Sequence, residues 1–343
     1  MAKRAGFGNR HNINHELSNI NNGIKRGQCD FNKSSFKSLC ADVLSNLTNK
    51  QNIYFTKRCN ESLKIIFKLM KHLGKKYVVL QDQGGWITYE QYAKKNKFEI
   101  FYMKTDYGLI SPRAFIDFVK TIARDIANHA DNTTANADIS DLSDVFVVIN
   151  SMPGYHALQD MKEIYDICSS EGIIVVNDIS GSIGYKAVGD FIVGSFGNSK
   201  PVNLGKGGFI AYNANSDKMH KLITPLIIED DSLDFVELYN LLKSINSRQE
   251  FYKNMHDDIV CKLNMLNKMH THDTVNKIIQ FENKIIHPHA TGINVIVKFD
   301  SDELRKVVIK FCDDNNLPYT LCPRYIRVNA DAVSIEVKRL NVN

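Results

Sequence analysis

Short apolar runs alternate with longer amphipathic stretches along most of the chain, beginning near residue 50. Runs such as DVFVVIN (144–150) and IIVVND (173–178) are nearly continuous in Val and Ile, which is typical of strands buried on both faces of a parallel sheet. Seven such strands are predicted, at 52–56, 76–82, 98–104, 144–150, 173–178, 190–196 and 208–213. The stretches 61–74, 88–96, 112–130 and 157–172 have helical patterns between them. The pattern therefore predicts an α/β protein with a mostly parallel, seven-stranded sheet.

The pattern changes after about residue 215. A long helical region runs to about 270, and short strands at 292–299, 317–321, 325–329 and 332–339 then surround a helix at 302–315. We expect an N-terminal arm at 1–35, a large domain at 36–240 and a small C-terminal α+β domain at 241–343. The arm is polar, Asn-rich and basic, and we interpret it as flexible or ordered by a partner. A two-domain enzyme with its cleft between the domains is the expectation.

Composition narrows the class of protein. The formal net charge of +5 is compatible with anionic substrates and too small to indicate a nucleic-acid-binding protein. No apolar run is long enough for a membrane helix, and the N-terminus lacks the apolar core of a signal peptide. Seven cysteines without a C-x-x-C pair indicate reduced thiols and a cytoplasmic protein. The histidine pairs in MHTH (269–272) and HPHA (287–290) lack accompanying ligands, so no metal site is predicted.

Ligands of open α/β sheets bind beyond the carboxyl ends of the strands, so the residues that follow each strand are the candidates. The first strand leads into KRCNES (57–62), where Asn60 and Ser62 can cap a helix whose free N–H groups would bind an anion. An ordinary capped helix is the alternative there. Trp86, the only tryptophan, follows two glycines after the second strand. It could stack on a planar ring or be a core aromatic.

Two further strand ends carry chemistry. Asp178 closes a buried strand, where a carboxylate needs a partner such as a protonated heteroaromatic nitrogen, unless it only caps the following turn. Lys200 lies in the glycine-bordered stretch GSFGNSKPVNLGKGG (194–208), where a neutral amine could attack a carbonyl, although a surface lysine is the alternative. An anion site, a stacking aromatic, a carboxylate and a lysine are together the parts that hold pyridoxal 5′-phosphate (PLP).

The same stretch carries a family resemblance. The motif resembles the S-F-x-x-x-K and G-E-G-G hallmark of the DegT-type (sugar) aminotransferases, which are fold-type-I PLP enzymes. It consists here of Ser195-Phe196, Lys200, and Gly205 to Gly208 with Lys206 between glycines. The segment 177–181 resembles the family's E-D-x-A-Q turn, and 59–63 loosely resembles its G-T-x-A-L helix start. The resemblance covers roughly residues 50–215.

The resemblance implies a fold-type-I PLP-transferase-like large domain in which Lys200 forms the aldimine with PLP and Asp178 pairs with the pyridine nitrogen. It also implies contacts to the cofactor from Asn60, Glu61, Ser62, Trp86, Ser180 and Ser195. The implied activity is an aminotransferase that moves an amino group from an amino acid donor to a keto acceptor, by family analogy a keto sugar. Relatives complete each site across a homodimer, so a homodimer is implied as well. Three residues are candidates for contact with substrate: His156, Arg324 and Arg327.

Three departures from the family pattern bear on the reaction. Gly181 stands where the family has a glutamine, for which Ser180 or Ser182 would substitute, and Lys206 reverses the charge of the family's glutamate. Cys59 and Asn60 replace the glycine and threonine of the phosphate site. A PLP-dependent lyase on the same fold, and a non-catalytic binding or regulatory protein, therefore stay open as alternatives.

Overall fold

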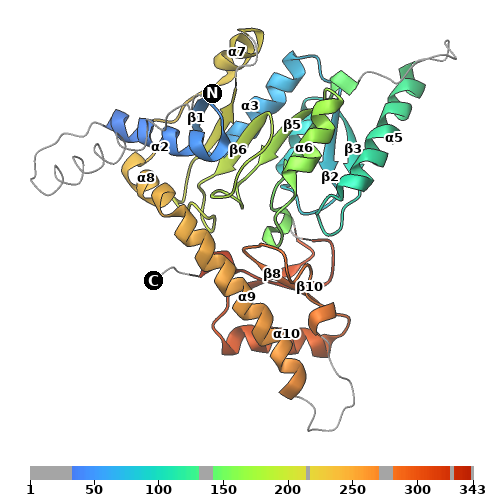
Figure 1. Cartoon of the computed structure of the whole chain (residues 1–343), viewed down its shortest axis with the longest axis vertical. Helices are drawn as coiled ribbons and strands as arrows, with labels where there is room; N and C mark the ends of the chain where they lie inside the picture. Colours follow the sequence, from blue (N-terminus) through green and yellow to red (C-terminus); the bar gives the residue numbers. More distant parts are fainter. Residues whose placement is uncertain (1–32, 131–141, 214–216, 270–280, 325–327, 341–343) are drawn as a thin grey trace, which may run out of the picture.

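The computed structural model describes residues 33–130, 142–213, 217–269, 281–324 and 328–340, and its larger sheet has seven strands (Figure 1). These are β1 (Asn52–Thr56), β2 (Tyr77–Gln81), β3 (Glu99–Met103), β4 (Val145–Asn150), β5 (Ile174–Asp178), β6 (Phe191–Ser195) and β7 (Gly208–Tyr212). Their order is β1-β7-β6-β5-β4-β2-β3. β2 to β6 pair in parallel, whereas β7 is antiparallel to both β6 and β1. The predicted α/β fold with a mostly parallel seven-stranded sheet is confirmed.

Helices cover both faces of this sheet. The helices α3 (Cys59–His72) and α4 (Thr88–Lys95) share one apolar core with alternate strand residues such as Val78 and Leu80. Val79, between them in sequence, packs in a different core with α5 (Pro112–Ala130) and α6 (Met161–Ser170). This assignment follows from strand geometry, because successive side chains point to opposite faces. Both faces are buried, which is why the strands are apolar throughout.

One helix of the large domain was not predicted. α2 (Lys33–Thr48) packs its buried residues Cys40 and Leu44 in one core with Phe235 of α8 (Phe235–Lys243). Its apolar positions are four residues apart, but polar residues such as Ser and Asn fill the rest, so the helical signal is weak. Tertiary packing against α8 and β1 stabilises it. Residues 1–32 of the predicted arm lie outside the described part of the chain.

The long helix α9 (Ile245–Met269) runs from the edge of the large sheet towards a second, smaller sheet (Figure 1). That sheet is antiparallel, in the order β8 (Val295–Lys298), β10 (Ala332–Ile335), β9 (Tyr319–Cys322). The helix α10 (Asp302–Asp314) begins at the cap Ser301, whose Oγ accepts from the Leu304 N–H at 3.2 Å. The strand predicted at 325–329 falls partly outside the described residues. A short helix, α7 (Asp217–Ile223), follows β7.

Strand direction fixes which loops meet. β1 is antiparallel to β7, and β7 is antiparallel to β6, so β1 runs in the same direction as the parallel strands. The segments that follow β1, β2, β4, β5 and β6 therefore lie at one edge of the sheet, which is the edge where ligands bind in this class of fold. No helix within the described residues is long and apolar enough to cross a bilayer.

Candidate active site

A cavity of about 400 Å³ opens at this edge of the sheet. The lining comes from the segments after β1, β2, β4, β5 and β6, and consists of Arg58, Cys59, Asn60, Trp86, Asn150, Tyr155, Asp178, Ser180, Ser195, Gly197, Asn198, Lys200, Gly205, Lys206 and Gly207. Six residues predicted to contact a cofactor are among them: Asn60, Trp86, Asp178, Ser180, Ser195 and Lys200. The fold thus brings together side chains that are up to 140 positions apart in the sequence.

Asp178 ends β5 and is almost fully buried, at 3% exposure. Its Oδ2 accepts from the Tyr89 hydroxyl at 2.5 Å and its Oδ1 accepts from the Ser180 N–H at 2.9 Å. Burial raises the pKa of Asp178, and these hydrogen bonds oppose that shift. A buried carboxylate held in this way is suited to a cationic partner, because the partner's charge would favour the ionised form.

Lys200 lies in the loop between β6 and β7. The Gly197–Gly205 bridge and the bond from the Phe196 N–H to the Gly207 carbonyl, at 3.1 Å, hold this loop at its base. The half-buried Lys200 side chain reaches into the cavity, where its Nζ donates to the Tyr155 hydroxyl. The Asp178 charge raises the pKa of the buried Cys59 thiol and the Lys200 charge lowers it. The amine and the carboxylate therefore both lie close to this thiol.

The start of α3 forms the opposite wall. The first N–H groups of a helix have no partner inside it, so a helix N-terminus attracts anions. Gly208 of β7 permits the close approach, because a Cβ there would lie 2.5 Å from the Cys59 nitrogen and 2.8 Å from the Gly194 oxygen. Ser195 Oγ accepts from the Gly197 N–H at 3.1 Å, which leaves its hydroxyl hydrogen to donate. These groups form a donor set for a phosphate.

Trp86 is tied to that wall. Its indole Nε1 donates to Asn60 Oδ1 at 2.8 Å, and the ring is half-buried. The bond fixes the indole beside the helix start, where its face can pack on a planar ligand.

Several predicted residues lie elsewhere. Ser62 is fully buried and its hydroxyl pairs with Thr56 Oγ1 at 2.8 Å, while Glu61 lines a different groove with Lys57 and Lys64. His156 is 1% exposed and its ring stacks on His287, with centroids 5.4 Å apart, so it lies behind the cavity wall. Burial lowers the pKa of His156 to about 3. These side chains do not line the cavity.

Of the two arginines proposed for substrate, only Arg324 can be placed. Arg324 is exposed and is not among the lining residues, and Arg327 lies outside the described residues. Lys206, whose role the sequence left open, lines the cavity and is also exposed, with its Nζ donating to the Ser232 carbonyl at 3.1 Å.

Sequence reasoning missed several lining residues, among them Asn150, Arg58 and Tyr155. Asn150 closes β4 as Asp178 closes β5, so the rule that found the aspartate could have found it too. Arg58 immediately precedes the helix start, and its type and place were a usable signal. Tyr155 adjoins His156, which was predicted instead. The backbone conformation decides which of the two side chains faces the cavity, and the sequence does not indicate that conformation.

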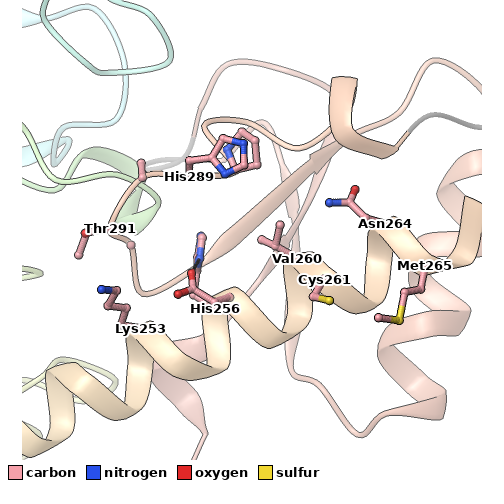
Figure 2. Close-up of a pocket in the computed structure, with 12 residues that line it drawn as sticks. Lys253, His256, Val260, Cys261, Asn264, Met265, His289 and Thr291 are labelled. Atoms are coloured by element: carbon pink, nitrogen blue, oxygen red, sulfur yellow. Dashed lines mark hydrogen bonds and ion pairs between the residues drawn. The ribbon is translucent and has the colours of Figure 1, made fainter.

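Another cavity, of about 590 Å³, lies between α9 and the loop 288–292. Figure 2 shows His256, Val260 and Asn264 on the helix, facing His289 and Thr291 of the loop. Its lining mixes charged groups of both signs and neutral polar groups with apolar ones, and it contains none of the residues predicted to contact a cofactor. The chemistry concentrated around Lys200 and Asp178 therefore marks the smaller cavity as the candidate site.

Comparison with protein families gives one match, to the MJ1341 family C-terminal domain, over residues 261–343. This match covers about a quarter of the chain and lies in the region of the small sheet. No curated protein matches the chain.

Many solved structures share the fold. Serine palmitoyltransferase from S. paucimobilis, solved with a PLP–myriocin aldimine, is similar at a TM-score of 0.57 and 14% identity, over 90% of this chain and 73% of that one. A SepCysS–SepCysE N-terminal domain complex gives 0.57 and 14%, over 89% and 80%. 3-Amino-5-hydroxybenzoic acid synthase gives 0.55 and 12%, over 94% and 90%. The chain therefore has the fold-type-I fold of PLP-dependent enzymes, as the sequence predicted.

Proposed function

We propose that this protein is a PLP-dependent aminotransferase that moves an amino group from an amino acid to a keto acceptor. The observation that carries the proposal is that the Lys200 amine, the Asp178 carboxylate and the start of α3 line one cavity. Several structures of the same fold were solved with PLP. A homodimer in the cytoplasm, and a keto sugar as acceptor, belong to the same proposal.

The residues present fit PLP chemically. The α3 N-terminus, Asn60 and Ser195 offer donors to a phosphate, and Trp86 offers an apolar face. Asp178 offers a buried carboxylate for a protonated ring nitrogen. PLP, when bound, supplies an electron sink for charge that develops at the carbon bearing the amino group.

Each side chain then has a definite task. Lys200 Nζ would be the amine that holds the aldehyde group of the cofactor, and the same amine would carry a proton to and from the reacting carbon. Asp178 would keep the proton on the ring nitrogen, and Tyr89 and the Ser180 N–H hold its carboxylate in place. Trp86 would cover the cofactor and exclude water.

Covalent trapping tests the proposal. Purified protein is mixed with PLP, reduced with borohydride and digested, and the modified peptide is identified by mass spectrometry. We expect a visible absorption band before reduction and a single adduct on Lys200. Lys200→Ala should abolish both.

Lys162→Ala is the matched control, because Lys162 is an exposed lysine on α6 that pairs with Asp166 and does not line the cavity. It should retain the band and the adduct. A wild-type protein that stays colourless with excess PLP, or an adduct spread over surface lysines, would refute the proposal.

The reaction type is tested separately. The PLP-loaded protein is incubated with L-glutamate and then with each other common amino acid, and the cofactor is extracted and separated. Conversion to pyridoxamine phosphate supports transamination. Release of a keto acid and ammonia with the cofactor unchanged would instead identify a lyase.

A further inference from the structure

Tyr155 lies at the end of an unusual backbone segment. Gly154 and Tyr155 both have left-handed backbone angles, with φ of 57° and 65°. This conformation costs a bulky residue about 1–2 kcal/mol, so surrounding contacts must hold it. The Gly154 N–H donates to the Gly84 carbonyl at 3.0 Å, and the Tyr155 carbonyl accepts from the Ile293 N–H at 2.8 Å. Contacts from two segments far apart in the sequence, around Gly84 and around Ile293, therefore fix the place of this tyrosine.

The ring occupies space that Gly181 leaves. A Cβ at position 181 would lie 2.8 Å from Tyr155 Cδ1 and 3.0 Å from its Cε1. Tyr155 is 4% exposed, so its ring has little room to retreat. The absence of a side chain at position 181 thus makes room for the Tyr155 ring.

Two ammonium groups lie against this one ring. Lys200 Nζ is 4.3 Å from the ring centroid and donates to the hydroxyl, while Lys338 Nζ, from the small domain, is 4.4 Å from the centroid. Lys338 is itself paired with buried Glu336. The other charged or titratable residues that line the same cavity are Arg58, Cys59, Asp178 and Lys206.

We propose that Tyr155 is a positioning residue, whose hydroxyl accepts from the Lys200 amine and whose ring, seated on Gly181, orients that amine in the cavity. Because Lys200 is the amine that the proposed function assigns to PLP, this role in catalysis rests on that function. The geometry itself concerns only residues of this chain, so it can be tested without cofactor.

The test is the pH profile of Lys200 acetylation in the cofactor-free protein, measured by competition labelling with acetic anhydride and mass spectrometry. Tyr155→Phe removes one oxygen and the acceptor for the protonated amine. The labelling midpoint of Lys200 should fall by about one pH unit, and labelling at neutral pH should become about tenfold faster. Lys162 in the same sample is the internal reference.

Tyr165→Phe is the matched control. Tyr165, on α6, is likewise a hydrogen-bonded tyrosine, since its hydroxyl donates to Asp190 Oδ1 at 3.2 Å, but it does not line the cavity. Tyr165→Phe should leave the Lys200 acetylation profile unchanged.

Gly181→Ala is the second test variant. Its methyl group would push the Tyr155 ring away and should shift the Lys200 acetylation profile in the same direction as Tyr155→Phe.

An unchanged Lys200 profile in a folded Tyr155→Phe protein would overturn this role. The proposed PLP binding is measured in a separate experiment, as the amount of borohydride-trapped adduct on Lys200. If acetylation shifts as expected and wild type forms no PLP adduct, the pairing of Tyr155 with Lys200 stands and the proposed function fails.

Discussion

The carboxylate of Asp178 loses most of its contact with water in the folded chain, and burial raises its pKa. A folded state that holds a proton more tightly than the unfolded state loses stability as pH rises from the ordinary carboxyl pKa through the raised one. Asp178 therefore destabilises the cofactor-free protein at neutral pH. Its ionised form is nevertheless what a cationic ring nitrogen requires.

Asp178→Asn should separate these two effects. Asparagine can still accept from the Ser180 N–H and pair with Tyr89, but it carries no buried charge. In urea unfolding of the cofactor-free protein, the variant's stability relative to wild type should rise with pH and level off above the raised pKa. Its PLP affinity should fall by about 30-fold or more, because the cofactor loses a buried charged partner. Lower stability together with unchanged PLP affinity would contradict this assignment.

Among the departures from the family motif, Gly181 now has a structural reason. The tyrosine ring at 155 occupies the volume that a side chain at 181 would need. Ser182, one of two serines considered as a substitute for the missing glutamine, pairs with Ser151 Oγ at 2.6 Å and does not line the cavity. Ser180 does line it.

At the scale of elements, the site depends on how closely β7 approaches α3. A Cβ at position 208 would meet backbone atoms of Arg58, Cys59 and Gly194, which cannot move aside as a flexible side chain could. The start of α3 and the β6–β7 loop are thus held together by a position that tolerates only hydrogen.

Gly208→Ala should therefore lower stability by about 1–3 kcal/mol and also weaken PLP binding. Gly74→Ala is the control, because Gly74 has a φ of 79° and open space around it, at the far end of α3. It should cost about 1 kcal/mol through backbone strain alone and leave PLP affinity unchanged. Urea unfolding and PLP titration measure the two effects. Equal loss of PLP affinity in both variants would mean that the close approach has no special role.

At the scale of the whole molecule, the segments around the smaller sheet reach the surroundings of the candidate site. The Ile293 N–H and the Lys338 ammonium reach Tyr155, and the Asn329 N–H donates to Gln83 Oε1 at 2.8 Å. Lys338 is held by Glu336, which is fully buried, and by Asn294 Oδ1 at 2.8 Å. This ion pair links the core of the small domain to the wall of the cavity.

Lys338→Met should be strongly destabilising, by about 3–5 kcal/mol, because it leaves Glu336 charged and buried without its main partner. Adding Glu336→Gln should recover a large part of that loss. Lys310→Met removes an exposed lysine that pairs with Asp314 on α10, and should change stability by less than about 1 kcal/mol. Thermal or urea unfolding compares the three. A small effect of Lys338→Met alone would show that Glu336 is satisfied by other groups.

The sequence by itself determined the seven strands, their mostly parallel arrangement, the place of Asp178 at a strand end and that of Lys200 in the loop after the next strand. The alternation of apolar runs with helical patterns can be seen in short windows of the sequence. Strands that are buried on both faces of the sheet appear there as continuous runs of Val and Ile. A weakly amphipathic helix such as α2 escaped this reasoning, because its stability comes from packing on α8 and not from its own pattern.

Only the tertiary structure decided which strand-end residues face one cavity. Ser62 and His156 lie beside the right loops but point into packed interior, whereas Asn150 and Tyr155 reach the cavity. The direction of a side chain at a loop depends on backbone angles, such as the left-handed pair at Gly154 and Tyr155, and on the glycine that leaves room for the ring. Those angles are set by contacts between segments distant in sequence, so no local pattern encodes them.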